Sequence, residues 1–281
     1  MSGWLVTGAR GQLGHHLLDQ LTGEDVVGLA RADLDITDGA AVDAAIEQHR
    51  PDVVINAAAY TAVDAAEEDT ATAFAVNASA PRLLATALRK FGGRLIHVST
   101  DYVFDGASGV PYEPDDRTSP RSVYGQSKLD GELAVRQTLP DAAHVVRTAW
   151  VYGGPGPNFV DTMRRLESAR DTIDVVDDQV GSPTWVHDLA AALIALGRAQ
   201  ASPGVLHYAN TGQASWCELA REVFRLVGAD PARVHAVGTE SFPRPAPRPT
   251  WSVLSTASWT RLGLPAPRPW QEALAESLRT G

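Results

Sequence analysis

Short apolar runs alternate with segments of helical pattern as far as about residue 152 of the 281-residue chain. Each run is continuously apolar, which is typical of a strand that is buried on both faces of a parallel sheet. Strands of this kind in alternation with helices predict an α/β fold built on a doubly wound parallel sheet. The predicted strands are residues 3–8, 26–29, 52–56, 94–99 and 144–147. The predicted helices are residues 12–22, 38–50, 70–91 and 123–138.

The second half of the chain is less regular. Residues 153–157 are rich in glycine and proline, and residues 242–249 carry a proline at nearly every second position, which excludes a core helix or a central strand there. Further helices are predicted at 188–198 and 215–227 and a strand at 205–208. We therefore expect two domains. The dinucleotide-binding domain would comprise 1–152 and about 185–208, and the smaller C-terminal substrate-binding domain 153–184 and 209–281.

The composition argues against several classes of protein. There are 24 Lys and Arg residues against 34 Asp and Glu, so the net charge is −10, which argues against binding to nucleic acid or to an anionic membrane surface. No apolar run approaches the roughly 20 residues that a membrane-spanning helix needs, and the first residues lack the pattern of a secretory signal. The single cysteine, Cys217, can form no disulfide within the chain. We expect a cytoplasmic protein.

Three glycines follow the first predicted strand. Gly8, Gly11 and Gly14 form the pattern G-x-x-G-x-x-G at the start of the first predicted helix. In a Rossmann-like fold such glycines allow a tight turn, a close approach of the backbone to a diphosphate, and close packing of helix against strand. The diphosphate then lies at the helix N-terminus, where free N–H groups and the helix dipole favour an anion. The pattern at this place predicts a dinucleotide cofactor.

The end of the second predicted strand indicates which dinucleotide binds. NAD-specific folds usually carry an acidic residue there, whereas this chain has Ala30 followed by Arg31, whose guanidinium suits a 2′-phosphate. We therefore favour NADPH and leave NADH open. Asp35 and Ile36 are expected to contact the adenine, and the small side chains at 57–59 leave room for a cofactor at the edge of the sheet.

Tyr124 and Lys128 lie four residues apart and so share one face of a predicted helix. A neighbouring ammonium is expected to lower the pKa of a phenol, which is ordinarily about 10. The fourth predicted strand ends next to Thr100, at the edge of the sheet where ligands bind in such folds. These groups beside a nicotinamide predict hydride transfer to a ketone, with Tyr124 as proton donor and Thr100 bonded to the carbonyl.

Seven motifs between residues 8 and 252 carry a resemblance to a known family. They are GARGQLG (8–14), NAAAYTAVDAAE (56–67), STDYVFDG (99–106), VYGQSKLDGE (123–132), RTAWVYG (147–153), DDQVGSPT (177–184) and RPTWS (248–252). With them the chain resembles the extended short-chain dehydrogenases/reductases and, more narrowly, the dTDP-4-dehydrorhamnose reductase family. The resemblance implies NAD(P)H-dependent reduction of the C4 ketone of a dTDP-4-keto-6-deoxy-L-hexose, dTDP-4-dehydrorhamnose first among them.

The resemblance also assigns roles to single positions. The catalytic residues would be Thr100, Tyr124 and Lys128. The residues that would bind the cofactor are Gly8, Gly11, Gln12, Leu13, Arg31, Asp35, Ala57, Ala58, Ala59 and Lys128, with Tyr124 bordering both ligands. The residues that would approach the dTDP-sugar substrate are Thr61, Val63, Thr100, Asp101, Tyr124, Trp150, Asn158, Gln179 and Arg248.

The chain departs from the family at one place that concerns metals. Some members carry a glutamate after the third glycine that helps to hold Mg²⁺ at a dimer contact, where this chain has His15 and His16. Adjacent side chains cannot share one helix face. We therefore predict no metal site, and the oligomeric state stays open, with a homodimer as one alternative.

Other functions share parts of this pattern. Lineages with these motifs include reductases for antibiotic sugars, such as one resembling dTDP-dihydrostreptose synthase, and the motifs do not separate these substrates. A 4,6-dehydratase is disfavoured because Tyr102 follows Asp101 where dehydratases typically carry Glu, and an epimerase would keep its NAD bound throughout. A non-catalytic NADP-binding regulatory subunit would have no need of all three catalytic residue types.

Overall fold

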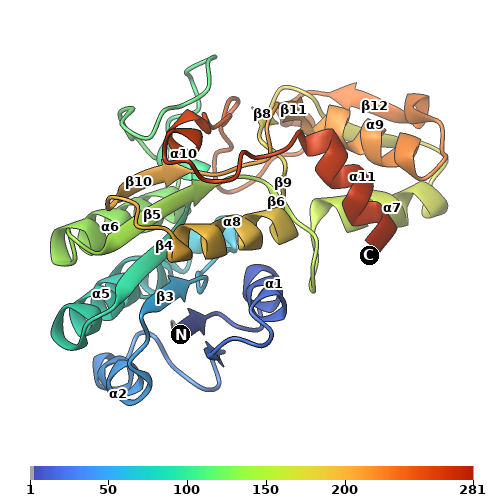
Figure 1. The fold of residues 1–281 in the computed structure, drawn as a ribbon. Coiled ribbons are helices and arrows are strands. Elements are labelled where there is room, and N and C mark those ends of the chain that lie inside the picture. The colour runs from blue at the N-terminus through green and yellow to red at the C-terminus, as the bar shows by residue number, and fades with distance from the viewer. Residues whose placement is uncertain (1–2, 281) are drawn as a thin grey trace.

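The computed structural model describes residues 3–280, and its central element is a sheet of six parallel strands (Figure 1). The strand order is β10-β5-β4-β3-β1-β2, and every neighbouring pair is parallel. The strands are β1 (Trp4–Thr7), β2 (Val26–Leu29), β3 (Val53–Asn56), β4 (Arg94–Thr100), β5 (Ala143–Thr148) and β10 (Gly204–His207). The predicted α/β fold with a doubly wound parallel sheet is confirmed.

Helices cover both faces of this sheet (Figure 1). They are α1 (Gln12–Gln20), α2 (Gly39–His49), α3 (Val63–Ala66), α5 (Ala80–Phe91), α6 (Val123–Thr138) and α8 (Val186–Arg198). Val6 and Ile55 belong to an apolar core with helices α1 and α8, whereas their neighbours Leu5 and Val54 belong to a second core with helices α2 and α5. Because successive side chains of a strand point to opposite faces, a continuous apolar run is needed to fill both cores.

The helical segment predicted over 70–91 is not one regular α-helix. A π-helical turn at Ala75–Ser79 joins α4 (Thr70–Phe74) to α5. The turn contains the buried Asn77, whose amide accepts from the backbone N–H of Tyr60 (2.8 Å) and donates to the Tyr60 carbonyl (3.0 Å). Periodicity alone could not reveal this turn, because the contacts that accompany it involve a residue outside the segment. Single π-helical turns of this kind are frequent at functional sites.

The rest of the chain forms small elements beside the sheet. Three two-stranded sheets pair β6 with β9, β7 with β12, and β8 with β11. Their strands are β6 (Val151–Tyr152), β7 (Ile173–Val176), β8 (Val180–Gly181), β9 (Thr184–Trp185), β11 (Ala214–Ser215) and β12 (Val234–Val237). The helices are α7 (Phe159–Ala169), α9 (Trp216–Leu226), α10 (Ala257–Arg261) and α11 (Trp270–Thr280), of which only α9 was predicted.

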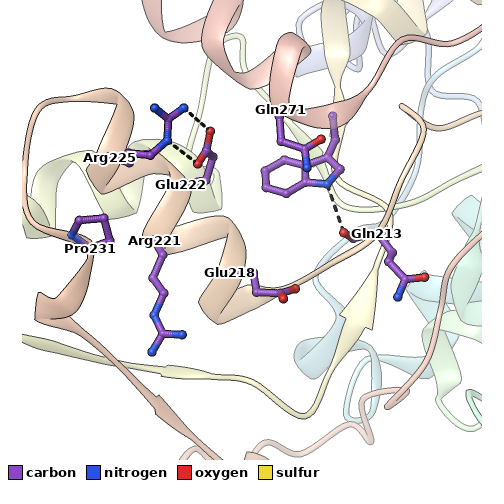
Figure 2. Close-up of a pocket in the computed structure, with 8 residues that line it drawn as sticks. Gln213, Glu218, Arg221, Glu222, Arg225, Pro231 and Gln271 are labelled. Carbon is purple, nitrogen blue, oxygen red and sulfur yellow. Dashed lines mark hydrogen bonds and ion pairs between the residues drawn. The ribbon is translucent and has the colours of Figure 1, made fainter.

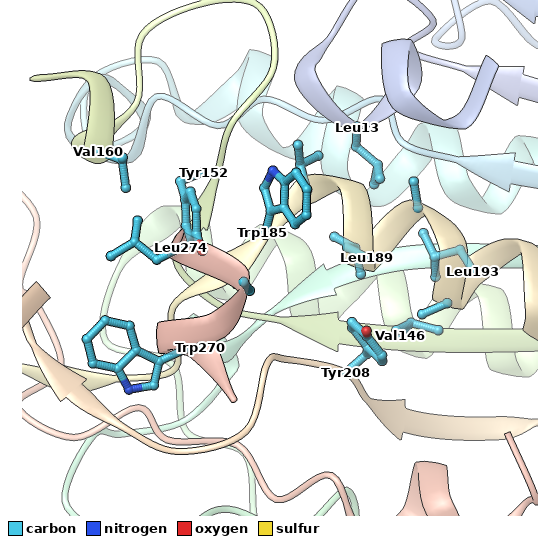
Figure 3. Packing of buried hydrophobic residues seen from close by; sticks show 14 of the residues in the cluster. Leu13, Val146, Tyr152, Val160, Trp185, Leu189, Leu193, Tyr208, Trp270 and Leu274 are labelled. Atoms are coloured by element: carbon cyan, nitrogen blue, oxygen red, sulfur yellow. The ribbon is translucent and has the colours of Figure 1, made fainter. Parts of the chain in front are cut away.

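One apolar core runs from the sheet into these smaller elements (Figure 3). It joins Leu13 of α1 and Leu189 of α8 to Tyr152, Trp185 and Trp270. The predicted division into two domains therefore stays a prediction. Within residues 3–280, no helix is long and apolar enough to cross a membrane.

Candidate active site

A cavity of about 860 Å³ lies where the strands β1, β2 and β3 end. The chain passes from β1 to β2 on one side and returns to β3 on the other, so the strand order reverses between β1 and β3. Ligands of open α/β sheets bind at such a switch point, beyond the carboxyl ends of the strands. The volume is within the range of about 300–1,000 Å³ that is usual for small-molecule sites.

The glycine loop forms one wall of this cavity. Gly8 has φ +69°, and a Cβ at Gly8 would lie 2.7 Å from the backbone nitrogen of Ala58 at the end of β3. A Cβ at Gly14 would collide with the Gly8 carbonyl. The loop can therefore lie this close to both neighbours only with glycine at these positions. Helix α1 begins directly afterwards at Gln12, so its free N–H groups lie at the loop.

Most of the predicted cofactor residues line the cavity. They are Gly8, Gly11, Arg31, Asp35, Ile36, Ala57, Ala58 and Ala59. Arg10, inside the glycine loop, also lines it and was missed, although an arginine between two phosphate-binding glycines is a readable signal. Gln12, Leu13, Tyr124 and Lys128 are not among the lining residues. The Gln12 side chain donates to the Pro157 carbonyl (3.1 Å) and Leu13 is buried in the core.

These residues fit a dinucleotide. The cavity offers small side chains at the end of β3, a helix N-terminus and two arginines, Arg10 and Arg31. Anions are favoured at helix N-termini, and guanidinium groups bind phosphate by two parallel hydrogen bonds. Asp35 accepts from the backbone N–H and the hydroxyl of Thr37 (2.9 and 2.7 Å), which lowers the pKa of its carboxyl and keeps it ionised.

Tyr124 lies at the start of α6, and two contacts fix that helix end. The Ser122 hydroxyl accepts from the Gly125 N–H (3.1 Å), and Glu67 accepts from the Val123 N–H (2.9 Å). The phenol is buried, and burial raises its pKa to about 12 against a partial lowering by the nearby Thr100 hydroxyl. The structure thus brings Tyr124 close to Thr100, the last residue of β4.

Lys128 lies one turn after Tyr124, and its ammonium donates to the Val98 carbonyl (2.6 Å). Burial lowers the pKa of Lys128 to about 8, although the nearby Glu132 carboxylate raises it. Among the described residues, Thr100 and Asp101 shift the pKa of Tyr124 but Lys128 does not. The expectation that Lys128 lowers the pKa of this phenol is therefore wrong here, because the ammonium is directed to a carbonyl of β4.

Tyr124 is also connected to the cofactor cavity. It packs in a small apolar cluster with Tyr60 and Val63, which follow β3, and its ring meets that of Tyr102 edge to face at 5.5 Å. Tyr60 itself lines the cavity. Of the predicted substrate residues, Val63 thus belongs to the surroundings of Tyr124, and Thr61 lies exposed beside it in the chain.

Trp150 and Gln179 are joined by a residue that was not predicted, Trp216. The indoles of Trp150 and Trp216 stack with centroids 3.5 Å apart and planes inclined by 2°. Trp216 also donates from Nε1 to the Gln179 side chain (3.2 Å). Trp150 has φ +46°, an uncommon conformation for a bulky residue that is often found at ligand sites. Trp216 opens α9 after the N-cap Ser215, and the only available signal was an aromatic residue at a helix start.

Arg248 forms an ion pair instead of standing free. Its guanidinium donates to Asp64 Oδ2 in α3 (2.8 Å) and to the Ala246 carbonyl (2.8 Å). Arg244 lies 3.9 Å from the same carboxylate. The proline-rich segment is thereby tied to the helix that follows β3, which brings Arg248 close enough to Tyr102 to lower the pKa of that phenol against the effect of burial.

Asn158 lies in another part of the molecule. It is the N-cap of α7, where its side chain accepts from the Asp161 N–H (3.0 Å). With His15 and His16 it lines a separate cavity of about 400 Å³. Within residues 3–280, no group of three or more His, Cys, Asp and Glu side chains is placed to hold a metal ion.

A smaller cavity of about 330 Å³ lies between α9 and α11 (Figure 2). Of its two arginines, Arg225 is paired with Glu222 (2.6 and 2.8 Å), and the Trp270 indole donates to the Gln213 carbonyl (3.2 Å). The residues that line it include neither the glycine loop nor Tyr60, which connects the larger cavity to Tyr124. We therefore place the active site at the carboxyl edge of the sheet.

Comparison with known proteins gives consistent matches over the whole chain. A family model described as the RmlD substrate binding domain matches residues 2–281. A dTDP-4-dehydrorhamnose reductase of Streptomyces griseus is 53% identical over 280 residues, which cover 98% of this chain and 92% of that protein. A probable dTDP-4,6-dihydroxy-2-methyloxan-3-one 4-ketoreductase of Streptomyces antibioticus is 51% identical over 277 residues, which cover 98% of this chain and 94% of that protein. The crystal structure of dTDP-4-dehydrorhamnose reductase from Bacillus anthracis in complex with NADP superposes with a TM-score of 0.96 at 36% identity. This superposition covers 100% of this chain and 99% of that one.

Proposed function

The chain belongs to the dTDP-4-dehydrorhamnose reductase family, and from this premise we propose that it reduces the C4 ketone of a dTDP-4-keto-6-deoxy-L-hexose with NADPH or NADH. The substrate that we propose first is dTDP-4-dehydrorhamnose, with dTDP-L-rhamnose as the product. The observation that carries the proposal is the meeting of Thr100 and Tyr124 next to a cavity that fits a dinucleotide.

The roles of the residues follow from their chemistry. When bound, the reduced nicotinamide supplies the hydride for the ketone carbon. The buried phenol of Tyr124 stays protonated at neutral pH and donates its proton to the ketone oxygen, while Thr100 hydrogen bonds to the same oxygen. Lys128, a cation held by the Val98 carbonyl, is placed to bind ribose hydroxyls. Arg10 and Arg31 support a preference for NADPH through its 2′-phosphate.

The substrate would lie between α3 and the smaller elements. We propose that Thr61, Val63, Trp150 and Gln179 surround its sugar and base, and that Arg248 interacts with its diphosphate once the pair with Asp64 rearranges. Asn158 has weaker support, because it lines another cavity. The domain boundaries, the cytoplasmic location, the absence of a metal site and the oligomeric state remain predictions.

The test is an assay of the purified protein with enzymatically prepared dTDP-4-dehydrorhamnose and NADPH. We expect loss of NADPH absorbance and formation of dTDP-L-rhamnose. If neither dTDP-4-dehydrorhamnose nor any other dTDP-4-keto sugar consumes the cofactor, the proposed function is wrong.

One alternative has a specific observation in its favour. The 51% identity to the probable 4-ketoreductase of Streptomyces antibioticus is close to the 53% identity to the Streptomyces griseus reductase. A related ketoreductase acting on another dTDP-4-keto sugar is therefore the second candidate. Comparison of kcat/KM for the two kinds of sugar under identical conditions separates them, since discrimination between substrates is a ratio of these constants.

A further inference from the structure

The hydroxyl hydrogen of Thr100 already has a partner. Its Oγ1 lies 3.0 Å from Asp101 Oδ1 and accepts from the Tyr102 N–H (3.2 Å). A hydroxyl has one hydrogen to donate and two lone pairs to accept with, so a hydrogen donated to Asp101 cannot be donated elsewhere. Thr100 can donate to a substrate oxygen only if this arrangement changes.

Among these hydrogen-bond partners, the Asp101 carboxyl is the one whose protonation state can change. Its side chain is buried, at 2% exposed, and its Oδ2 is shielded from solvent and makes no hydrogen bond of good geometry among the described residues. Burial raises the pKa of the carboxyl to about 6, although the nearby Ser252 hydroxyl lowers it. A buried carboxylate oxygen without a full set of donors is unfavourable, and protonation removes the charge.

The charged groups around Asp101 do not neutralise it. From α3, Asp64 faces this region, and from the C-terminal segment Arg248, but these two are paired with each other at 2.8 Å. From α6, the neutral phenol of Tyr124 lies alongside, and the Lys128 ammonium is directed to the Val98 carbonyl. Because no cation in the described part of the chain pairs with the Asp101 carboxylate, only protonation can neutralise it.

The protonation state of Asp101 sets the direction of the hydrogen bonds. An ionised Asp101 can only accept, so the Thr100 hydrogen points to it and away from a ketone. A protonated Asp101 donates to Thr100, and this donor and the Tyr102 N–H fill both lone pairs of Oγ1. The hydrogen of Thr100 is then available to the ketone oxygen that Tyr124 protonates.

We propose, building on the proposed reductase function, that Asp101 is a positioning residue that must be protonated for the reaction. As a neutral carboxyl it donates to Thr100 and so leaves the hydroxyl hydrogen of Thr100 free for the ketone oxygen. Its own proton is not transferred, because the proton that reaches the product oxygen leaves Tyr124. The reaction therefore slows as the pH rises through the pKa of Asp101.

The first test compares the pH dependence of kcat/KM for the wild type, Asp101→Asn and, as a matched control on an exposed carboxylate, Asp115→Asn. An asparagine amide donates to Thr100 at every pH, as a protonated aspartate does. For the wild type and the control we expect kcat/KM to fall about tenfold per pH unit above the pKa of the free enzyme's Asp101. Asp101→Asn should stay active and lose this decline, while a separate decline from Lys128, whose pKa is about 8, persists. The same decline in Asp101→Asn, or a folded but inactive Asp101→Asn, would overturn the proposal.

The second test needs neither substrate nor turnover. Carbon-13 labelling of the aspartate carboxyls, with the Asp101 signal assigned by its loss in Asp101→Asn or by through-bond correlation, gives its titration in the free wild-type enzyme. We expect a midpoint near 6, well above the ordinary 3.8. A midpoint at or below the ordinary value, in an enzyme that reduces a dTDP-4-keto sugar, would overturn this inference and leave the proposed function intact. A wild type that reduces no such sugar would defeat the proposed function instead.

Discussion

Tyr124 is an acid in this structure rather than a phenolate. Burial raises its pKa to about 12, so at neutral pH it holds the proton that a reduced ketone requires. Tyr124→Phe keeps the ring that packs against Tyr102 and removes the proton. We expect kcat to fall on the order of 10²-fold or more, with NADPH binding nearly unchanged in a fluorescence titration. Unchanged turnover would remove Tyr124 from the mechanism.

Arg31 and Arg10 are expected to determine how tightly the enzyme binds NADPH. Both line the cofactor cavity, and charge-assisted hydrogen bonds to a phosphate contribute about 1.5–3 kcal/mol each. Arg31→Ala should therefore raise KM for NADPH by about 10- to 100-fold and leave KM for NADH almost constant. Arg82→Ala, at an exposed position on α5, is the control. An equal rise for both cofactors would mean that Arg31 does not bind the 2′-phosphate.

The sequence predicts a site residue when its role depends on its place beside a strand or helix end. It does not predict a residue whose role depends on contacts with distant parts of the chain. Gly8, Thr100 and Tyr124 stand next to strand or helix ends that the sequence pattern reveals. Asn77 and Trp216 were missed because their partners lie far away in the chain: Ser127 for Asn77 (3.0 Å) and Trp150 for Trp216. Nothing in the sequence around either residue indicates these contacts.

The first residue of α9, Trp216, holds the Trp150 side chain in place. Trp216 stacks on Trp150 and bonds to Gln179, so it holds two proposed substrate residues at once. Trp216→Leu should raise KM for the dTDP-sugar up to about tenfold, from a stacking contribution of about 0.5–1.5 kcal/mol, with a smaller effect on kcat. Trp216→Phe should restore part of the affinity.

A spectroscopic signal separates this role of Trp216 from a general loss of structure. Two indoles stacked in parallel at 3.5 Å couple electronically, and their paired circular dichroism bands should vanish in Trp216→Phe and in Trp150→Phe alike. If the bands persist in both variants, the stack does not exist in solution. If KM stays constant while the bands vanish, the stack does not position the substrate.

A buried ion pair connects β4, β5 and α6 behind the active site. Glu132 and Arg147 are joined at 2.7 Å, and Ser99 donates to the same carboxylate (2.5 Å). Burial, together with the charge of Arg147, lowers the pKa of His207 to about 3, so that histidine is neutral. Glu132→Leu leaves the Arg147 charge buried without its partner, which should lower the free energy of unfolding by about 3–5 kcal/mol.

Urea denaturation measures this effect, and two comparisons sharpen it. The double variant Glu132→Leu, Arg147→Met should lose less than Glu132→Leu alone, because no unpaired charge remains. Asp43→Ala breaks the exposed pair with Lys90 (3.1 Å) and should change stability by less than about 1 kcal/mol. A double variant less stable than Glu132→Leu alone would show that the unpaired Arg147 charge does not account for the loss of stability.

The whole molecule divides into a part that the sequence predicts and a part that it does not. The central sheet could be predicted because neighbouring residues of each strand fill two different cores, which gives the sequence short apolar runs. The small sheets could not, since β6, β8, β9 and β11 are only two residues long. Their positions depend on partners such as Trp251, which pairs with Val180 from far along the chain.

The site also depends on the whole molecule. The residues proposed to bind the cofactor and the proposed proton donor belong to different strands and helices, and the sheet brings them to one edge. The most direct measurement follows deuterium from NADPH labelled at the transferable position of the nicotinamide C4. With dTDP-4-dehydrorhamnose and the wild type, the account predicts deuterium at the sugar C4 of the product, and almost none with Tyr124→Phe or Thr100→Val over the same time. Protium at the sugar C4, or the same deuterium incorporation in both variants as in the wild type, would contradict it.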